Sequence, residues 1–177
     1  IKILGDYAYI ADGRYGYCIV SVEDPEHPEE FFYNSTNKKI KHVTVSGEYA
    51  FIANEYSGMR IVGVADPGNP IEISHIDTEW SVKSIAVVDD FAYIASEHAD
   101  MHIISVSDRE NPEEVGYLEL PGHSRDIAVS GDLVYLVNDR NGLIIISVAN
   151  PQQPEIIGSF PMGERHSYCF AVSGNYV

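Results

Sequence analysis

The hydrophobic residues of this chain alternate with polar ones at a period of two. In "HVTVSGEYAFIAN" (42–54), one alternating run ends at a Gly-Glu turn and a second run follows it directly. "MRIVGV" (59–64) comes next, and after the break "DPGNP" the pattern resumes in "IEISHI" (71–76). Short alternating runs rich in Val, Ile and Tyr and bounded by Gly, Asp, Asn and Pro are typical of β-strands. The pattern therefore predicts four short strands, separated by turns, and no helix.

The same four-strand pattern returns every 42 residues along the chain. Three columns of residues keep this interval in register. They are the turns at Gly5-Asp6, Gly47-Glu48, Asp89-Asp90 and Gly131-Asp132; Pro28, Pro70, Pro112 and Pro154; and Gly16, Gly58, Asp100 and Gly142. A fifth turn follows at 174–175. We therefore divide the chain into repeat units 1–42, 43–84, 85–126 and 127–169, with a partial unit at 170–177.

A unit of about 40 residues with four antiparallel strands has the size of one β-propeller blade. Leucine-rich repeats are shorter, helical repeats need a helical period, and a continuous β-sandwich gives no reason for a fixed interval. We predict an all-β fold: residues 1–177 as a single propeller, partial or complete, with about four blades and the start of a fifth. Because "FAVSGNYV" (170–177) repeats the text of "IKILGDYA" (1–8), we expect an excerpt of a larger propeller. The alternative is a closed ring of four blades with the last strand docked elsewhere.

Two segments carry a family resemblance. "GMRIVGVADPGNP" (58–70) and "GLIIISVANPQQP" (142–154) resemble the LVIVD repeat, which starts with Gly-Leu, continues as an apolar strand and ends in Asp-Pro-x-x-Pro. "AVSGDLVYLVND" (128–139) is similar to the segment that precedes this motif. The final Asp of the motif is replaced here by Ser21, Gly63, Ser105 and Ser147, and Arg109 stands where the first Pro of the third unit belongs. The resemblance implies a secreted or cell-surface propeller of bacteria or archaea.

Composition restricts the partners of this chain. It has 27 Asp and Glu against 11 Lys and Arg, a formal net charge of −16, and an apolar content of 45%. A surface so acidic repels phosphate backbones, so we expect no nucleic acid, whereas a protein or glycan partner is compatible with it. The apolar runs are too short to cross a bilayer, so we expect no membrane insertion in this segment. Self-assembly with other domains or copies stays open, as does a bond between Cys18 and Cys169.

Blade topology sorts the loops onto two faces, with the strands of each unit named a to d and strand a innermost. The a–b turns and the Pro-rich connections then share one face, and the variable b–c and d–a loops share the other. A rigid scaffold presents binding residues on variable loops. The candidate ligand-binding residues are Lys41, His42, Asn54, Trp80, Lys83, Glu97, His98, His123, Arg125, Asp126, Asp139, Arg165 and His166.

Lys41, Lys83 and Arg125 occupy equivalent positions and predict a ring of cations at the channel mouth. Such a ring suits a carboxylate or sulfate, and Trp80 would stack on a sugar. The structural alternative is that these cations bridge to carboxylates of the next blade and that Trp80 is a wedge between blades.

Two classes of function follow. The first is an extracellular or cell-surface scaffold, structural or binding, for protein or glycan ligands. The alternative is a propeller enzyme of hydrolase or lyase type, metal-dependent or not, with His123 and Asp126 at the channel mouth. No nucleophile elbow, P-loop or dinucleotide motif supports the alternative. We expect no resident cofactor or metal, and retain calcium at the acidic b–c loops as the one candidate.

Overall fold

The computed structural model describes residues 1–36, 38–97, 100–120, 122–162 and 170–172. Within them the chain forms four sheets, and each sheet contains four consecutive antiparallel strands. Blade 1 contains β1 (Lys2–Leu4), β2 (Tyr7–Ala11), β3 (Gly16–Ser21) and β4 (Glu29–Ser35). Blade 2 contains β5 (His42–Ser46), β6 (Tyr49–Ala53), β7 (Met59–Gly63) and β8 (Ile71–Ile76). Blade 3 contains β9 (Val82–Val88), β10 (Phe91–Ser96), β11 (Asp100–Ser105) and β12 (Glu113–Glu119). Blade 4 contains β13 (Ser124–Ser130), β14 (Leu133–Asn138), β15 (Gly142–Ser147) and β16 (Glu155–Phe160).

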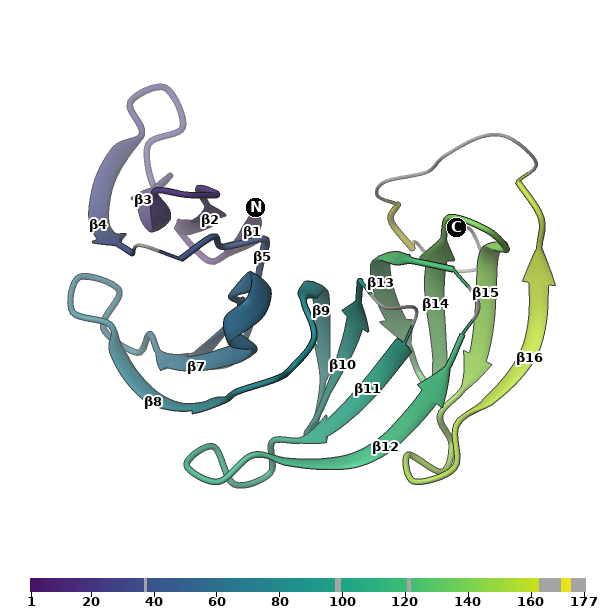
Figure 1. Cartoon of the computed structure of the whole chain (residues 1–177). Coiled ribbons are helices and arrows are strands. Elements are labelled where there is room, and N and C mark those ends of the chain that lie inside the picture. The colour runs from purple at the N-terminus through teal and green to yellow at the C-terminus, as the bar shows by residue number, and fades with distance from the viewer. Residues whose placement is uncertain (37, 98–99, 121, 163–169, 173–177) are drawn as a thin grey trace.

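The four blades stand side by side in an arc that is open between blades 1 and 4 (Figure 1). Their first strands lie innermost, since β5 contacts β9 and β9 contacts β13, and their fourth strands form the exposed outer edge. The predicted all-β propeller of four-stranded blades is confirmed. Most of the partial fifth unit, 170–177, lies outside the described residues. A 3₁₀ turn, η1 (Glu55–Ser57), occupies the b–c loop of blade 2, and the described part of the chain has no helix able to cross a membrane.

Two-residue turns join the first two strands of each blade, and their first position has a positive φ. The φ angle is 59° at Gly47 and 51° at Asp89. Glycine adopts this region without steric cost, and Asp tolerates it better than most residues. The turn column found in the sequence therefore reflects a backbone requirement.

A β-bulge recurs at the same place in every blade. The pairing between the third and fourth strands shifts register at Ile19/Val20 in blade 1 and at Ile61/Val62 in blade 2, and at the equivalent residues of blades 3 and 4. A bulge increases the local twist of a strand pair, so it bends the outer strand of each blade. The sequence pattern did not predict this feature.

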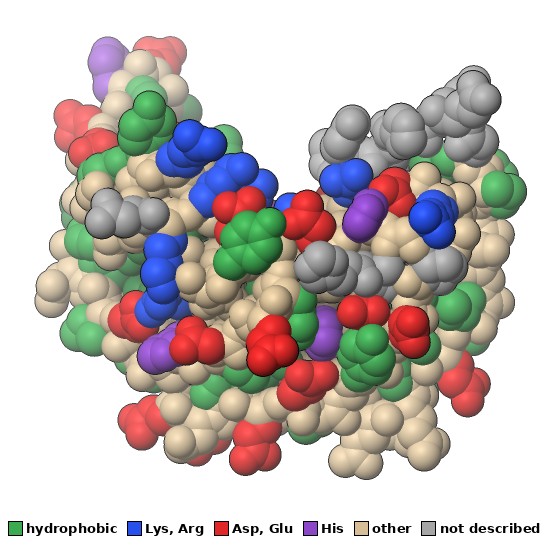
Figure 2. All heavy atoms as spheres, viewed as in Figure 1, with side chains coloured by type: hydrophobic (Ala, Val, Ile, Leu, Met, Phe, Trp, Pro, Cys, Tyr) green, Lys and Arg blue, Asp and Glu red, His purple; other side chains and the backbone are tan. Residues whose placement is uncertain are grey.

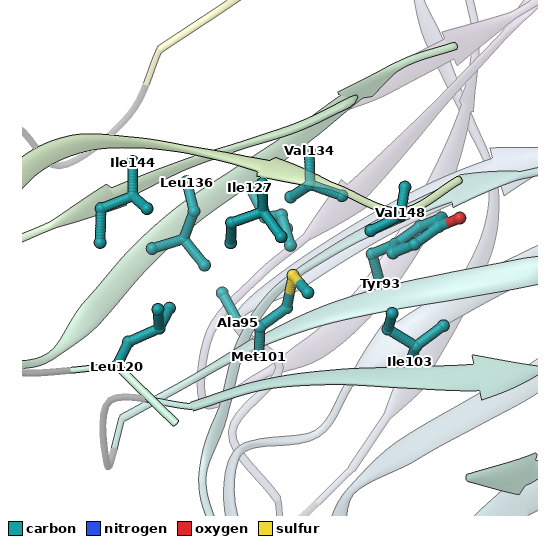
Figure 3. Close-up of a cluster of buried hydrophobic side chains, with 11 residues drawn as sticks. Tyr93, Ala95, Met101, Ile103, Leu120, Ile127, Val134, Leu136, Ile144 and Val148 are labelled. Atoms are coloured by element: carbon teal, nitrogen blue, oxygen red, sulfur yellow. The ribbon is translucent and has the colours of Figure 1, made fainter. Parts of the chain in front are cut away.

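The hydrophobic core is divided into three clusters, and each lies between two successive blades. Between blades 3 and 4, Met101 and Ile103 from one sheet meet Leu136 and Ile144 from the other (Figure 3). Met101 and Ile103 are fully buried, as are the equivalent Met59 and Ile61 of blade 2. Each sheet therefore depends on its neighbour to cover its apolar face.

We predict that Gly58→Ala destabilises the fold by about 2–4 kcal/mol. Gly58 has a φ of 72°, and a Cβ there would lie 1.9 Å from the carbonyl oxygen of Ile76. Gly13→Ala is the matched control, because Gly13 has a φ of 55° but open space around its Cβ position. Urea unfolding should show a loss of only about 1–2 kcal/mol for the control. Equal losses in the two variants would contradict the predicted clash.

Candidate functional site

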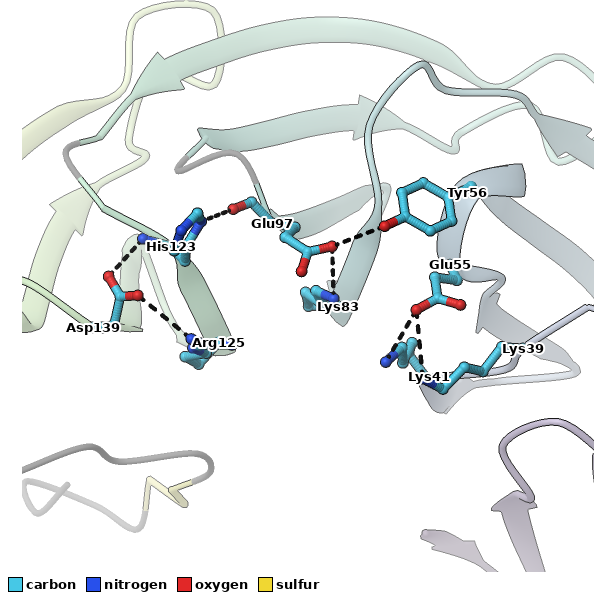
Figure 4. A network of polar contacts seen from close by, with 9 residues as sticks. All are labelled: Lys39, Lys41, Glu55, Tyr56, Lys83, Glu97, His123, Arg125 and Asp139. Carbon is cyan, nitrogen blue, oxygen red and sulfur yellow. Dashed lines mark hydrogen bonds and ion pairs between the residues drawn. The ribbon is translucent and has the colours of Figure 1, made fainter.

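Blades 2, 3 and 4 each carry one cation–carboxylate pair at the same place on the loop face (Figure 4). The pairs are Lys41 with Glu55, Lys83 with Glu97, and Arg125 with Asp139, with N–O distances of 3.2, 2.9 and 3.4 Å. In each pair the cation lies at the start of the innermost strand, and the acid follows the second strand 14 residues later. The three cations of the predicted ring therefore occupy equivalent places.

These pairs close within one blade. The structural alternative predicted bridges to the next blade, and for Lys41 and Lys83 the described pairs show otherwise. The cause is the hairpin register: the backbone N–H of Lys41 donates to the carbonyl of Ala53 at 2.9 Å, which places Glu55 directly beside the lysine. The same register brings Asp139 to the backbone N–H of His123, at 2.7 Å.

Glu97 also links blade 3 to both of its neighbours (Figure 4). Tyr56 Oη of blade 2 donates to Glu97 Oε2 at 3.5 Å, and His123 Nδ1 of blade 4 contacts the Glu97 carbonyl oxygen. The hydrogen bond from Lys83 is the main reason why the pKa of Glu97 lies below its ordinary value. The charged form of Glu97 is therefore favoured.

An inner set of polar residues joins the innermost strands. His42, Ser84 and Asp126 are equivalent residues of blades 2, 3 and 4, each one position after a cation of the ring. Ser84 Oγ donates to Asp126 Oδ1 at 2.7 Å, and the backbone N–H of Ile85 donates to His42 Nδ1 at 3.4 Å. Of the three, His42 lines a cavity of about 250 Å³ along the inner strands. These contacts hold neighbouring blades at a fixed spacing.

His123 and Asp126, the residues of the enzymatic alternative, contact different groups. His123 is exposed and its ring meets the Glu97 carbonyl. The Asp126 carboxylate accepts from Ser84 Oγ and from the backbone N–H groups of Ile127 and Phe170, at 3.0 and 3.1 Å for the latter two. Its role as an acid or base stays a prediction.

Trp80 lies between blades 2 and 3. Its ring stacks on His102 with centroids 3.6 Å apart and an angle of 12° between the planes. His102 is buried and its Nδ1 lies 3.0 Å from Glu114 Oε1. Trp80 thus has the position expected of a wedge, while its stacking on a sugar stays a prediction.

Some predicted residues cannot be placed. His98, Arg165, His166 and Cys169 lie outside the described residues, so neither their role in ligand binding nor the Cys18–Cys169 bond is tested. The described ranges contain no group of three His, Cys, Asp or Glu side chains suited to a metal ion.

Sequence reasoning missed a basic hollow between blades 1 and 2. Arg14, Lys38 and Lys39 line a depression of about 500 Å³ together with residues 54–57. Glu55 Oε1 pairs with both Lys39, at 3.6 Å, and Lys41, at 3.2 Å. The proximity of Lys41 lowers the pKa of Lys39. The run "KKIK" (38–41) was the available signal, but the approach of Arg14 depends on the blade arrangement.

Comparison with known families identifies the repeat. The model of the LVIVD repeat matches residues 1–36, 39–78, 81–119 and 121–161. The chain belongs to the LVIVD-repeat family. The resemblance drawn from the sequence motifs is therefore confirmed, and the four matches follow the four blades of this LVIVD-repeat chain.

Among solved structures, the chain is similar to the computationally designed Ika8 protein. The TM-score is 0.75 at 8% identity, over 98% of this chain and 52% of that one. At this identity the likeness concerns the fold alone, and the chain spans about half of the length of the designed protein. Curated protein sequences give no match.

We predict that the stability of this LVIVD-repeat chain falls as the pH drops below about 6.5, in part through His42. Burial is the main cause that lowers the pKa of His42 from its ordinary 6.5; Lys2 adds to this and Asp126 opposes it. The folded state therefore favours the neutral ring. Its contribution to stability is present above pH 6.5 and is lost as the pH falls toward the lowered folded pKa.

Replacing the ring with a side chain that does not titrate tests this. Between pH 7 and 5.5, the free energy of unfolding of His42→Gln should fall by about 0.5–1 kcal/mol less than that of the parent protein, as measured by urea unfolding. Above pH 7 the two profiles should run parallel, which controls for unrelated effects of the substitution. Equal slopes across the acidic range would show that His42 is not the group responsible.

Proposed function

We propose that this LVIVD-repeat chain is a binding scaffold, secreted or on the cell surface, whose loop face holds an anionic group of a protein or glycan partner. The observation that carries the proposal is the basic hollow between blades 1 and 2. Arg14, Lys38 and Lys39 converge there in a chain whose net charge is −16.

The charge of the hollow is only partly balanced. Within the described residues, Glu55 is its one acid and pairs with Lys39, whereas Arg14 and Lys38 have no carboxylate within ion-pair distance. By contrast, the cations of blades 3 and 4 have partners of their own. Figure 2 shows the basic side chains gathered on the loop face beside acidic and hydrophobic ones. A concave basic site concentrates field lines and attracts a small anionic group.

One exposed aromatic ring lines the same hollow, and a second follows Arg14 in the chain. Tyr56 lines it and is 66% exposed, and Tyr15, next to Arg14, is 69% exposed. Exposed tyrosines beside arginine are typical of surfaces that bind protein or sugar. The acidic remainder of the surface disfavours a long polyanion, so a short anionic segment suits the site better than nucleic acid.

We predict that Arg14→Gln combined with Lys38→Gln weakens binding of an anionic probe by about 3–10-fold, since each exposed charge contributes up to about 1 kcal/mol. A sulfated oligosaccharide and an Asp/Glu-rich peptide are the two probes, titrated separately by calorimetry at low and at physiological salt. Binding of the parent protein should weaken as salt increases.

Arg140→Gln is the matched control, because Arg140 is an exposed cation on the loop of blade 4, outside the hollow. It should change the affinity less than twofold. The proposal fails if neither probe binds the parent at low salt, or if the control loses as much affinity as the double variant. The probe that binds more tightly distinguishes a glycan from a protein ligand.

A further inference from the structure

The repeat allows one gap between blades to be compared with the next, residue by residue. Between blades 2 and 3, Trp80 fills the gap, stacked on His102, which pairs with Glu114. At the equivalent positions, 42 residues earlier, the gap between blades 1 and 2 has Lys38, Arg60 and Glu72.

Between blades 3 and 4 a different set of side chains fills the space. Leu120, which is 2% exposed, packs there against Leu136 and Ile144 (Figure 3). Its equivalent in the first gap is Thr36, and the equivalent of Ile144 is Arg60. The chain thus closes two of its gaps with its own apolar or aromatic side chains.

The gap between blades 1 and 2 stays open as a pocket of about 290 Å³. This volume is at the lower limit of pockets that hold small molecules. Its inner wall is apolar, formed by Ile40, Ile52 and Val62, which are each at most 3% exposed. Lys38 and the Arg60–Glu72 ion pair, at 2.5 Å, lie along its polar wall. The pocket therefore has an apolar interior with a few charged groups, as ligand sites do.

A buried acceptor in this pocket lacks a partner. Asn54 is 2% exposed and lines the pocket, and its Oδ1 has no hydrogen bond among the described residues. The equivalent residues of the other blades are engaged: Ser96 Oγ accepts from the backbone N–H of Asp100, and Asn138 Oδ1 from that of Arg140. A buried unsatisfied acceptor destabilises the protein, so a ligand that donates to it gains affinity.

We propose that the pocket between blades 1 and 2 binds a small, electron-rich aromatic compound with one N–H or O–H donor, such as an indole or a phenol. The ring occupies the place that Trp80 fills in the next gap. Arg60 is the residue equivalent to His102, whose ring stacks on Trp80, and a guanidinium over an aromatic face is attracted to it. The donor group reaches Asn54 Oδ1.

This inference does not rest on the proposed anion site, although Lys38 and Asn54 line both. Indole is neutral and tests the pocket alone, whereas the sulfated and acidic probes test the basic hollow. Titration of the ¹⁵N-labelled protein with indole should give saturable amide shifts around Tyr17, Ile40 and Asn54, with a Kd of about 1 mM. 1-Methylindole, which cannot donate, should bind at least fivefold more weakly.

Filling the pocket from within should abolish binding. Lys38→Trp copies the second gap and should weaken indole binding at least tenfold, while Arg140→Trp adds the same side chain on the loop of blade 4, outside the pocket, and should change affinity less than twofold. If Lys38→Trp does not fold, Thr36→Leu, which places the equivalent of Leu120 in the first gap, tests in its place whether filling the pocket weakens indole binding.

Three results would each overturn the proposal. Indole shifts that do not saturate would show that there is no site, and shifts that map outside the pocket lining would place it elsewhere. Unchanged affinity in a folded Lys38→Trp or Thr36→Leu variant would show that the gap between blades 1 and 2 is not occupied.

Discussion

A four-stranded sheet has two faces, and a single blade of about 40 residues has nothing of its own to cover them. The apolar side chains that are buried on the face of one sheet meet side chains from the next. The three core clusters of this chain are the result, since each is built from two successive blades. The arc, the loop face and the pocket all follow from this requirement, because it fixes the spacing at which neighbouring sheets stand.

The sequence was sufficient to predict what depends on position within one unit. Gly58 must be glycine because its Cβ position lies against a backbone oxygen, so the glycine column marks the same loop wherever it occurs. The pairing of Lys41 with Glu55 was also within reach, because a two-residue turn fixes which residues of a hairpin face each other. Assigning the carboxylates to the next blade overlooked that register.

The side-chain contacts between repeat units could not be predicted from the sequence. Nothing near Trp80 in the sequence indicates that its ring stacks on a histidine of the next blade, and nothing near Arg14 indicates that it approaches Lys38. A repeat reveals equivalent positions but not which of them touch across a gap. The bulge between the third and fourth strands could not be predicted for a related reason. One extra residue in an exposed strand disturbs an alternation of apolar and polar residues that is already weak there.

The ion pairs of the loop face have a consequence for how such chains change in length. Because Lys83 and Glu97 belong to the same blade, a duplication that copies a whole blade copies both partners, and a deletion removes both. The charge of these pairs is therefore balanced blade by blade. The hydrogen bond from Ser84 to Asp126 instead joins two blades. A blade inserted between these two would separate the donor from the acceptor. The ion pairs within a blade therefore tolerate a change in the number of blades. The hydrogen bond between blades constrains which blade can follow which.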